Sequence, residues 1–314
     1  MLKKYLLAAS ATVLLHGPAV AQDYPVDTVT LVTHSSPGAG GDVFLRELAK
    51  VLGPTLGVTV VVENVTGGSS AKALAYVAQA PADGSVLYGT TPTFVYTSLL
   101  SNPEFDYQDI DEVVNVFEDP EVLFTSKASG MTTLEEVMTK AREGRGKWGA
   151  ANPASLERQS MELLKTAANV EAGIVTHEGG GDMMINVLNG SLDMGVGEMQ
   201  ELNAQVQAGE VVLLAVLTDE RLADFPDLPT VKESGYDVSV RKFRGIAGPK
   251  NLPADVIAAW EAAIPKMLES DEFKQWYAVN SLRPAFMNQA DYRVFIEEFA
   301  TETGDFLRSA GVIE

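Results

Sequence analysis

Short apolar runs with strand character alternate with amphipathic segments of helical spacing along almost the whole chain. In the first third, strands are predicted at residues 28–33, 58–63 and 85–89, with helices at 43–52 and 70–79 between them. Strands that alternate with helices of this length form βαβ units, whose strands lie parallel in one sheet. The pattern therefore predicts an α/β fold.

The same alternation returns after a stretch near residues 115–120, which is predicted to cross between two lobes. Strands are predicted there at 122–126, 147–150, 173–177, 192–196 and 211–217, and helices at 133–143, 155–168 and 182–189, with a short helix before residue 211. Two such runs indicate two α/β lobes, each with a mostly parallel sheet flanked by helices.

A loop at residues 226–236, rich in turn-forming residues, leads to a predicted strand at 237–246, which would return the chain to the first lobe. The two crossing strands would then form a hinge. Helices are predicted at 254–269, 271–280 and 289–309. The expected division is a signal peptide at 1–21, the first part of lobe 1 at 22–118, lobe 2 at 119–238, and a return crossing with C-terminal helices, mainly of lobe 1, at 239–314.

The first residues predict export. Lys3 and Lys4 precede an apolar run at residues 5–15, and an Ala-x-Ala pattern ends at Ala21. This order is typical of a secretory signal peptide cleaved after Ala21, and the run is shorter than the roughly 20 residues that a membrane span requires. A periplasmic protein without a lipid anchor is expected.

Composition excludes several classes of function. The chain has no cysteine, which removes disulfides, thiolate nucleophiles and cysteine-ligated metals. Its formal charge is −20, and loss of Lys3 and Lys4 with the signal peptide would make it −22. Such a surface argues against binding nucleic acid or anionic lipid, whose phosphates require a basic face.

The loop at residues 34–42 joins the first strand to the first helix and carries glycines at positions 38, 40 and 41. Glycine lets the backbone approach a ligand, and the start of a helix adds a positive dipole end, so this loop can hold an anion. It is not a nucleotide-binding loop, because the glycine expected three positions after Gly40 in a Gly-x-Gly-x-x-Gly motif is absent, and no Gly-Lys-Ser/Thr follows. Four similar loops follow, at 64–69, 90–93, 152–155 and 178–182.

Ligands of open α/β sheets bind outside the carboxyl ends of the strands, where all five loops are predicted to lie. The site is therefore assigned to these loops and to polar residues near them. The candidate ligand-binding residues are Ser35, Ser36, Gly38, Gly40, Gly41, Asp42, Thr91, Thr93, Asn152, Ser155, Arg158, Gly179, Gly180, Glu198 and Arg244.

Several of these candidates have a second interpretation. Asp42 opens a helix, where its carboxylate would cap free amides, and Ser155 is a plausible N-cap. Arg158 would clamp a second carboxylate or lie on a solvated helix face. Arg244 would bind ligand or form an ion pair between the lobes.

Glu198 and the two histidines at strand ends also have two possible roles each. Glu198 would contact an amine or hydroxyl of the ligand, or cap the helix that follows it. His34 and His177 each end a predicted strand, where a buried, hydrogen-bonded role is favoured over a functional one.

The loops and their neighbours resemble the substrate-binding subunits of tripartite tricarboxylate transporters, the Bug/TctC-type extracytoplasmic receptors. The likeness covers essentially the whole chain after the signal peptide. Its markers are Pro37-Gly38-x-Gly40-x-Asp42, Val62-Glu63-Asn64-x-x-Gly67-Gly68, Ala73-Leu74-Ala75-Tyr76, Pro81-x-Asp83-Gly84, Leu188-x-Gly190-x-Leu192-Asp193, Gln207-Ala208-Gly209, Pro226-x-Leu228-Pro229-Thr230 and Phe243-Arg244-Gly245-Ile246.

This resemblance implies a two-lobed clamshell, the Venus-flytrap fold of periplasmic binding proteins, with a carboxylate held between the lobes by loop amides and water. It also implies delivery to membrane subunits of a transporter driven by an ion gradient. The chain departs from many relatives at Ser35-Ser36, at Glu157-Arg158, and at Val196-Gly197-Glu198, where Phe-Asp-Asn is common. The usual substrate assignments therefore do not transfer.

An enzymatic function is disfavoured. The chain has no Gly-x-Ser-x-Gly or His-Glu-x-x-His motif, and it carries no recognisable site for a cofactor. His177, Glu178 and Asp182 lack a further histidine to complete a metal site. The sequence predicts a monomeric receptor for a di-, tri- or aromatic carboxylate. The alternatives are a sensory protein of the same fold that presents its ligand to a membrane partner, and a receptor for an amino acid.

Overall fold

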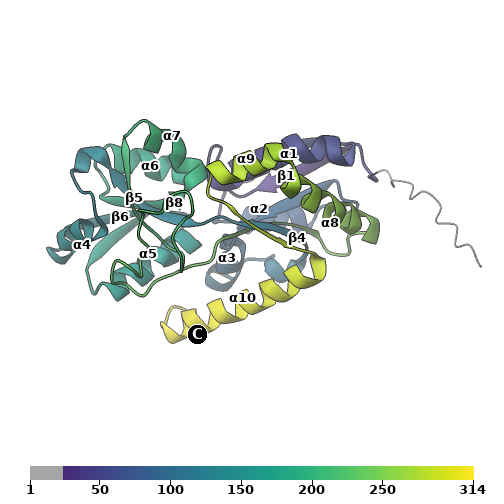
Figure 1. Cartoon of the computed structure of the whole chain (residues 1–314). Helices are drawn as coiled ribbons and strands as arrows, with labels where there is room; N and C mark the ends of the chain where they lie inside the picture. Colours follow the sequence, from purple (N-terminus) through teal and green to yellow (C-terminus); the bar gives the residue numbers. More distant parts are fainter. Residues whose placement is uncertain (1–23) are drawn as a thin grey trace, which may run out of the picture.

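Two β-sheets, each covered by helices on both faces, divide the molecule into two lobes that lie side by side (Figure 1). The computed structural model describes residues 24–314. The predicted signal peptide and its cleavage site lie outside the described residues. Within residues 24–314, no helix has the length and apolar character needed to cross a membrane.

Lobe 1 is built on the six-stranded sheet in the order β11-β4-β10-β3-β1-β2. Its strands are β1 (Thr28–Thr33), β2 (Thr59–Asn64), β3 (Val86–Thr90), β4 (Ile110–Glu118), β10 (Phe243–Pro249) and β11 (Arg283–Met287). Its helices are α1 (Gly40–Leu56), α2 (Ala71–Ala78), α3 (Thr93–Ser101), α8 (Ala254–Glu269), α9 (Asp271–Val279) and α10 (Gln289–Ser309).

Lobe 2 is built on the five-stranded sheet in the order β7-β6-β8-β5-β9. Its strands are β5 (Glu121–Ser126), β6 (Gly146–Ala151), β7 (Ala172–His177), β8 (Met194–Glu198) and β9 (Val211–Val216). Its helices are α4 (Leu134–Arg142), α5 (Leu156–Ala167), α6 (Gly180–Leu188) and α7 (Met199–Gln207).

Each sheet is mixed, but most of its strands run in one direction, as predicted: β1, β2, β3 and β4 in lobe 1, and β6, β7, β8 and β9 in lobe 2. The βα strands pair in parallel, β1 with β2 and β3, and β6 with β7 and β8. However, β10 lies between β3 and β4, and β5 lies between β8 and β9, all in antiparallel pairs. These two strands bring the chain in from the other lobe, so they start at the interface and run away from it. The strands of the βα units run the opposite way and end at the interface.

The chain passes between the lobes twice. Asp119 and Pro120 join β4 to β5, and residues 217–242 join β9 to β10. The second crossing was predicted as a strand at 237–246, but the strand spans Phe243–Pro249. Residues 237–242 form no strand, and Val238 and Val240 among them pack against the core of lobe 2. We propose lobe boundaries at 118/119 and 238/239, which these crossings support.

Helix α3 and strand β11 were not predicted, and of β4 only its end was, as a crossing near residues 115–120. Helix α3 was not predicted, because it is buried on most sides: its residues 93–98 are all buried, so it has no polar face to create a helical period. Strand β11 was left unassigned, and it contains Pro284. It lies at the sheet edge, where a residue without an N–H is tolerated.

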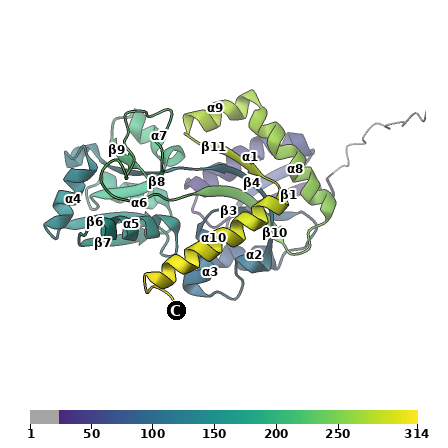
Figure 2. The same cartoon turned by 60° about the horizontal axis from the view of Figure 1, so that its bottom comes forward.

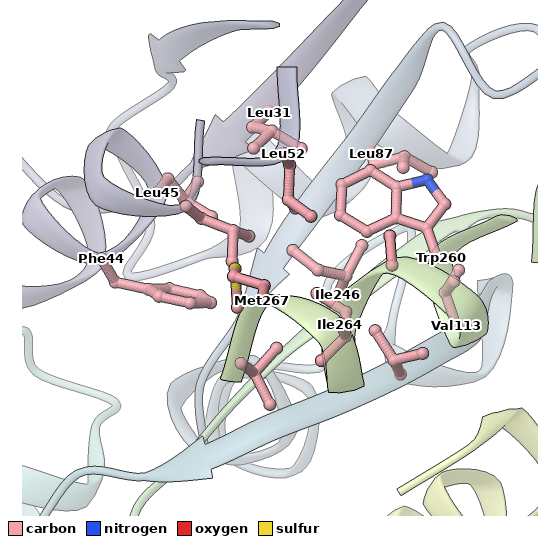
Figure 3. Packing of buried hydrophobic residues seen from close by; sticks show 14 of the residues in the cluster. Leu31, Phe44, Leu45, Leu52, Leu87, Val113, Ile246, Trp260, Ile264 and Met267 are labelled. Carbon is pink, nitrogen blue, oxygen red and sulfur yellow. The ribbon is translucent and has the colours of Figure 1, made fainter. Parts of the chain in front are cut away.

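Separate apolar clusters fill each lobe. In lobe 1, one cluster joins the sheet to α1, α8 and α9, with Trp260 and Leu45 fully buried (Figure 3). A second joins the other face to α2, α3 and α10. In lobe 2, Trp148 packs with α4 and α5 on one face, while Met183 packs with α6 and α7 on the other. Each lobe therefore has its own core.

Contacts outside the crossings also join the lobes. Helix α10 lies across lobe 1, and its C-terminal end reaches lobe 2 (Figures 1 and 2). There Leu307 packs with Tyr96 of α3 and Leu156 of α5. On another side, the Asn203 side chain donates a 2.8 Å hydrogen bond to the Asn280 side chain. The carboxyl ends of both sets of βα strands are thereby held facing one another.

Candidate functional site

The first turns of α1 and α6 face each other across the interface between the lobes. Helix α1 follows β1 and begins with Gly40 and Gly41, and α6 follows β7 and begins with Gly180. Neither helix has a side-chain cap, because its N-cap residue is Ala39 or Gly179. The uncapped amides and the positive dipole ends make both junctions suited to a negatively charged group.

Both glycines at the start of α1 are required by close packing. A Cβ on Gly40 would lie 2.5 Å from Arg244 Nη2 and 2.8 Å from Glu198 Oε2. A Cβ on Gly41 would lie 2.6 Å from Ser35 Oγ. The absence of a side chain at Gly40 therefore lets charged groups from lobe 2 and the return crossing approach the backbone of lobe 1, while Gly41 makes room for Ser35 of the same lobe.

The α6 junction is equally crowded. A Cβ on Gly180 would collide with the carboxylate of Glu201, and one on Gly179 would collide with Ser36 Oγ of lobe 1. Glu201 lies in the first turn of α7, and its carboxylate accepts a hydrogen bond from the backbone N–H of Gly40. A carboxylate from lobe 2 is therefore bound at the start of α1.

A small cavity of about 20 Å³ lies among these groups, enough for roughly one water. The structure brings ten of the predicted residues to its lining: Ser35, Gly40, Gly41, Thr91, Thr93, Asn152, Gly179, Gly180, Glu198 and Arg244. They come from four of the five predicted loops, from the end of β8 and from the return crossing. The loop at 64–69 does not reach the cavity.

Five predicted residues do not line this cavity. Gly38 has a φ of +83° and forms a turn, while Ser36 lies at the contact with Gly179. Asp42 accepts a 2.9 Å hydrogen bond from the Gly38 N–H and pairs with Arg46, so its carboxylate is bound within the loop and the helix of lobe 1. Burial raises the pKa of Asp42, but hydrogen bonds from Arg46, Gly38 and Asn64 outweigh this and lower it.

Ser155 and Arg158 also have structural roles. Ser155 is fully buried and caps α5, accepting a 3.1 Å hydrogen bond from the Arg158 N–H. The Arg158 side chain pairs with Glu162, one helical turn further on. It lines a separate hollow of about 760 Å³ that also includes Phe306. Arg158 therefore does not line the cavity, and its role as a clamp for a second carboxylate stays a prediction.

Six residues of the lining were missed by the sequence analysis: His34, Ala39, Ala151, Glu157, Glu201 and Lys242. Lys242 is two residues before Arg244, and this pair of cations in an acidic chain was an available signal. Glu201 follows Glu198 by three residues and lies in the first turn of the helix that Glu198 precedes. Glu157 was noted only as a departure from relatives.

Lys242 is buried at the centre of three carboxylates. Its Nζ lies 2.5 Å from Glu157 Oε1 and 3.3 Å from Glu121 Oε1, and it also pairs with Glu198. The three glutamates lie close enough together to hold a metal ion, but in this structure they surround an ammonium group. Glu121 and Glu157 have Lys242 as their cationic partner among the described residues, whereas Glu198 also pairs with Arg244.

Arg244 links the crossings to lobe 2. Its Nε donates a 2.8 Å hydrogen bond to Asp119 Oδ2, and its Nη2 donates a 3.1 Å bond to Glu198 Oε1. The inter-lobe ion pair proposed for Arg244 is thus present, and the residue also lines the cavity. The capping role considered for Glu198 is wrong, because its side chain makes no cap hydrogen bond to α7.

Burial perturbs the acids around the cavity. It raises the pKa of Glu201 to about 7, although the Gly40 N–H and Arg244 oppose the shift. It raises the pKa of Glu121 to about 7 against the attraction of Lys242. For Glu157, burial raises the pKa but the charge and hydrogen bond of Lys242 prevail and lower it. The site therefore contains more buried acid than its cations neutralise.

His34 and His177 differ in burial and in their hydrogen-bond partners. His34 is buried, and its Nδ1 lies 2.6 Å from the Tyr88 hydroxyl, which confirms the expected hydrogen bond. Burial lowers the pKa of His34 to about 4, so the imidazole is neutral at physiological pH. His177 is partly buried, with Nε2 3.1 Å from Asn186 Nδ2. The neutral His34 adds no positive charge to the cavity.

Comparisons with known proteins agree with this architecture. The model of the family described as "Tripartite tricarboxylate transporter family receptor" matches residues 44–312. Protein BugT of Bordetella pertussis is 25% identical over 310 residues, covering 96% of this chain and 94% of BugT.

Two solved structures share the fold. The periplasmic binding protein BugD superimposes with a TM-score of 0.86 at 23% identity, covering 92% of this chain and 99% of BugD. The R. palustris protein Rpa4515, solved with adipate, gives a TM-score of 0.87 at 24% identity, covering 93% and 99%.

Proposed function

The chain belongs to the tripartite tricarboxylate transporter receptor family, and from that membership we propose that it captures a small carboxylate between its lobes and delivers it to transporter membrane subunits. Proteins of this family and fold are solute-binding proteins, so the chain is a binding protein and not an enzyme. The chemistry of the proposed site is accordingly non-covalent.

One observation carries the carboxylate assignment. The N–H of Gly40, at the positive end of α1, already holds the carboxylate of Glu201, which also lies against Gly180 at the start of α6. A ligand carboxylate that displaced Glu201 would meet the same amides and the same two helix ends. The cavity is too small for such a ligand, so binding requires the lobes to separate and close again.

Short-range contacts are strong enough to overcome the acidic surface. Salt at 0.15 M screens charges beyond roughly 8 Å, so the net negative field acts weakly at the closed site. Each charge-assisted hydrogen bond contributes on the order of 1.5–3 kcal/mol, and four would provide roughly 6–12 kcal/mol before ordering costs. Micromolar affinity needs about 8 kcal/mol.

The cellular setting follows from the same relatives. BugD is described as a periplasmic binding protein, and Rpa4515 was solved with the dicarboxylate adipate. We propose that the present chain also acts in the periplasm as a monomer, exported by residues 1–21. Transport assays in vesicles carrying the cognate membrane subunits test the delivery step: uptake of the bound carboxylate must depend on this protein.

Isothermal titration calorimetry tests the binding step. The panel is succinate, adipate, L-aspartate and L-2-aminoadipate. Gly180→Ala places a methyl group in the cavity, whereas Gly181→Ala adds the same methyl group in open space one residue later. We expect the first variant to weaken binding at least about tenfold and the second less than about twofold. Equal affinities in both variants, or no binding of any panel member, would contradict the proposal.

A further inference from the structure

The cavity is surrounded by more carboxylates than cations. Five acidic side chains of the described residues lie at the lining or pair directly with it: Asp119, Glu121, Glu157, Glu198 and Glu201. Lys242 and Arg244 are the two cationic side chains in this set. His34 is neutral, so it does not reduce the difference. With five carboxyl groups and two cations, three carboxyl groups lack a counter-charge of their own.

Both cations are already occupied. Lys242 pairs with three glutamates, and Arg244 pairs with Asp119 and Glu198. Neither is free to bind a second carboxylate of a ligand without releasing a buried acid, which is costly where water is excluded. A plain dicarboxylate could place one carboxylate on the helix ends, but its other carboxylate would meet acidic groups.

Glu157 supplies an independent sign of a missing partner. Its side chain lines the cavity, and the residue is only 8% exposed. Its Oε1 pairs with Lys242, but its Oε2 is buried without a hydrogen-bond partner. Buried carboxylate oxygens are normally satisfied, so this atom is suited to accept a hydrogen bond from a donor in the cavity.

Glu201 would become a second acceptor once a ligand binds. Its carboxylate now occupies the amide of Gly40 and lies against Gly180. A ligand carboxylate that takes this position displaces Glu201 but leaves it tethered to the first turn of α7, beside the same cavity. The displaced carboxylate then needs a hydrogen-bond donor, and an ammonium group with three N–H bonds can serve both Glu201 and Glu157.

From this arrangement we infer that the ligand is an amino carboxylate, whose ammonium group binds Glu157 and Glu201 while its carboxylate binds the starts of α1 and α6. This inference rests on the proposed function and narrows its ligand class. The surroundings of Lys242 illustrate the recognition, because three glutamates there already enclose one ammonium group.

Matched ligand pairs test the inference by calorimetry on the purified protein. L-Aspartate is compared with succinate, and L-2-aminoadipate with adipate, since each pair differs by one amine. We expect the amino member to bind at least about tenfold more tightly. Glu157→Gln and Glu201→Gln should each reduce that ratio to about threefold or less, because an amide cannot form the charged pair.

Glu171→Gln is the matched control, because it removes one negative charge from an exposed position of lobe 2 and should leave the ratio unchanged. Thermal unfolding establishes that each variant is folded. The affinity ratio measured on the wild-type protein tests the ligand class without any substitution. If Glu157→Gln fails to fold, Glu201→Gln still tests the assignment of the acidic residues.

The outcomes separate the two proposals. If succinate and adipate bind as tightly as their amino partners, the inference fails and the carboxylate receptor stands. If both glutamine variants keep the wild-type ratio, the assignment of Glu157 and Glu201 is wrong. If no carboxylate binds, or butylamine binds as tightly as L-2-aminoadipate, the proposed function itself is overturned.

Discussion

The backbone N–H of Gly40 donates a hydrogen bond to the carboxylate of Glu201, joining the first turn of α1 in lobe 1 to the first turn of α7 in lobe 2. The two residues are 161 positions apart in the sequence. An anion-binding helix end in one lobe is thus matched to an acid in the other. This contact connects closure of the lobes with the chemistry of the cavity.

Gly40→Ala should destabilise the closed structure. The added Cβ would meet Arg244 and Glu198, which cannot move easily because they are paired and buried. Overpacking of this kind costs about 1–3 kcal/mol in free energy of unfolding. Urea denaturation measures the change. Gly181→Ala, whose methyl group is in open space within α6, should be neutral or stabilising by up to about 1 kcal/mol; equal losses in both would contradict the account.

The buried acids predict a pH dependence of stability. Burial raises the pKa of Glu201 from 4.5 to about 7. Between these values the unfolded chain loses the proton while the folded protein keeps it, so the free energy of unfolding falls as pH rises. Glu201→Gln cannot ionise. Its stability relative to the wild type should therefore increase from about pH 5 to about pH 8.

Denaturation curves at several pH values measure this difference. Glu171→Gln, which removes an exposed carboxylate, should run parallel to the wild type over the same range. If Glu201→Gln also runs parallel, the carboxyl of Glu201 is not held protonated by burial, and the described environment of the cavity is incorrect.

Arg244→Met should be strongly destabilising. The substitution leaves the buried Asp119 without its 2.8 Å partner and takes one of the two cations from Glu198. Removal of one member of a buried ion pair costs about 3–5 kcal/mol. Arg241→Met is the control: Arg241 pairs with Glu118 at the surface, where loss of the pair costs about 1 kcal/mol or less. Similar losses in unfolding free energy would refute the buried network.

Much of this architecture could be predicted because it depends on local patterns. The βα units of both lobes follow from apolar periodicity, and the glycine loops at residues 34–42 and 178–182 follow from position after a strand. Helix α3 and strand β11 were missed because their surroundings, and not their own sequences, determine them. The antiparallel β5 and β10 depend on the crossings, which periodicity does not encode.

The composition of the site was harder to predict. Backbone contributors such as Gly40 and Gly180 were found because their requirement is local. Glu157, Glu201 and Lys242 were missed because their role depends on contacts between residues more than 40 positions apart. Arg158 was assigned to the ligand from helix position alone, which specifies neither the direction of its side chain nor its pairing with Glu162.

Arg158→Ala should therefore leave ligand binding intact. The side chain pairs with Glu162 and lines a different hollow, so its removal should change the dissociation constants of adipate and L-2-aminoadipate by less than about twofold. Calorimetry of the variant beside Gly180→Ala checks this. A loss specific to the dicarboxylate would restore the clamp that the sequence suggested.

The most direct test follows the glycine amides themselves. In a spectrum of ¹⁵N-glycine-labelled protein titrated with L-2-aminoadipate, the amide resonances of Gly40 and Gly180 should shift together and saturate at one dissociation constant, because both helix ends bind the same carboxylate. Shifts confined to one lobe, or unchanged resonances of both glycines while calorimetry reports saturable binding, would contradict the account.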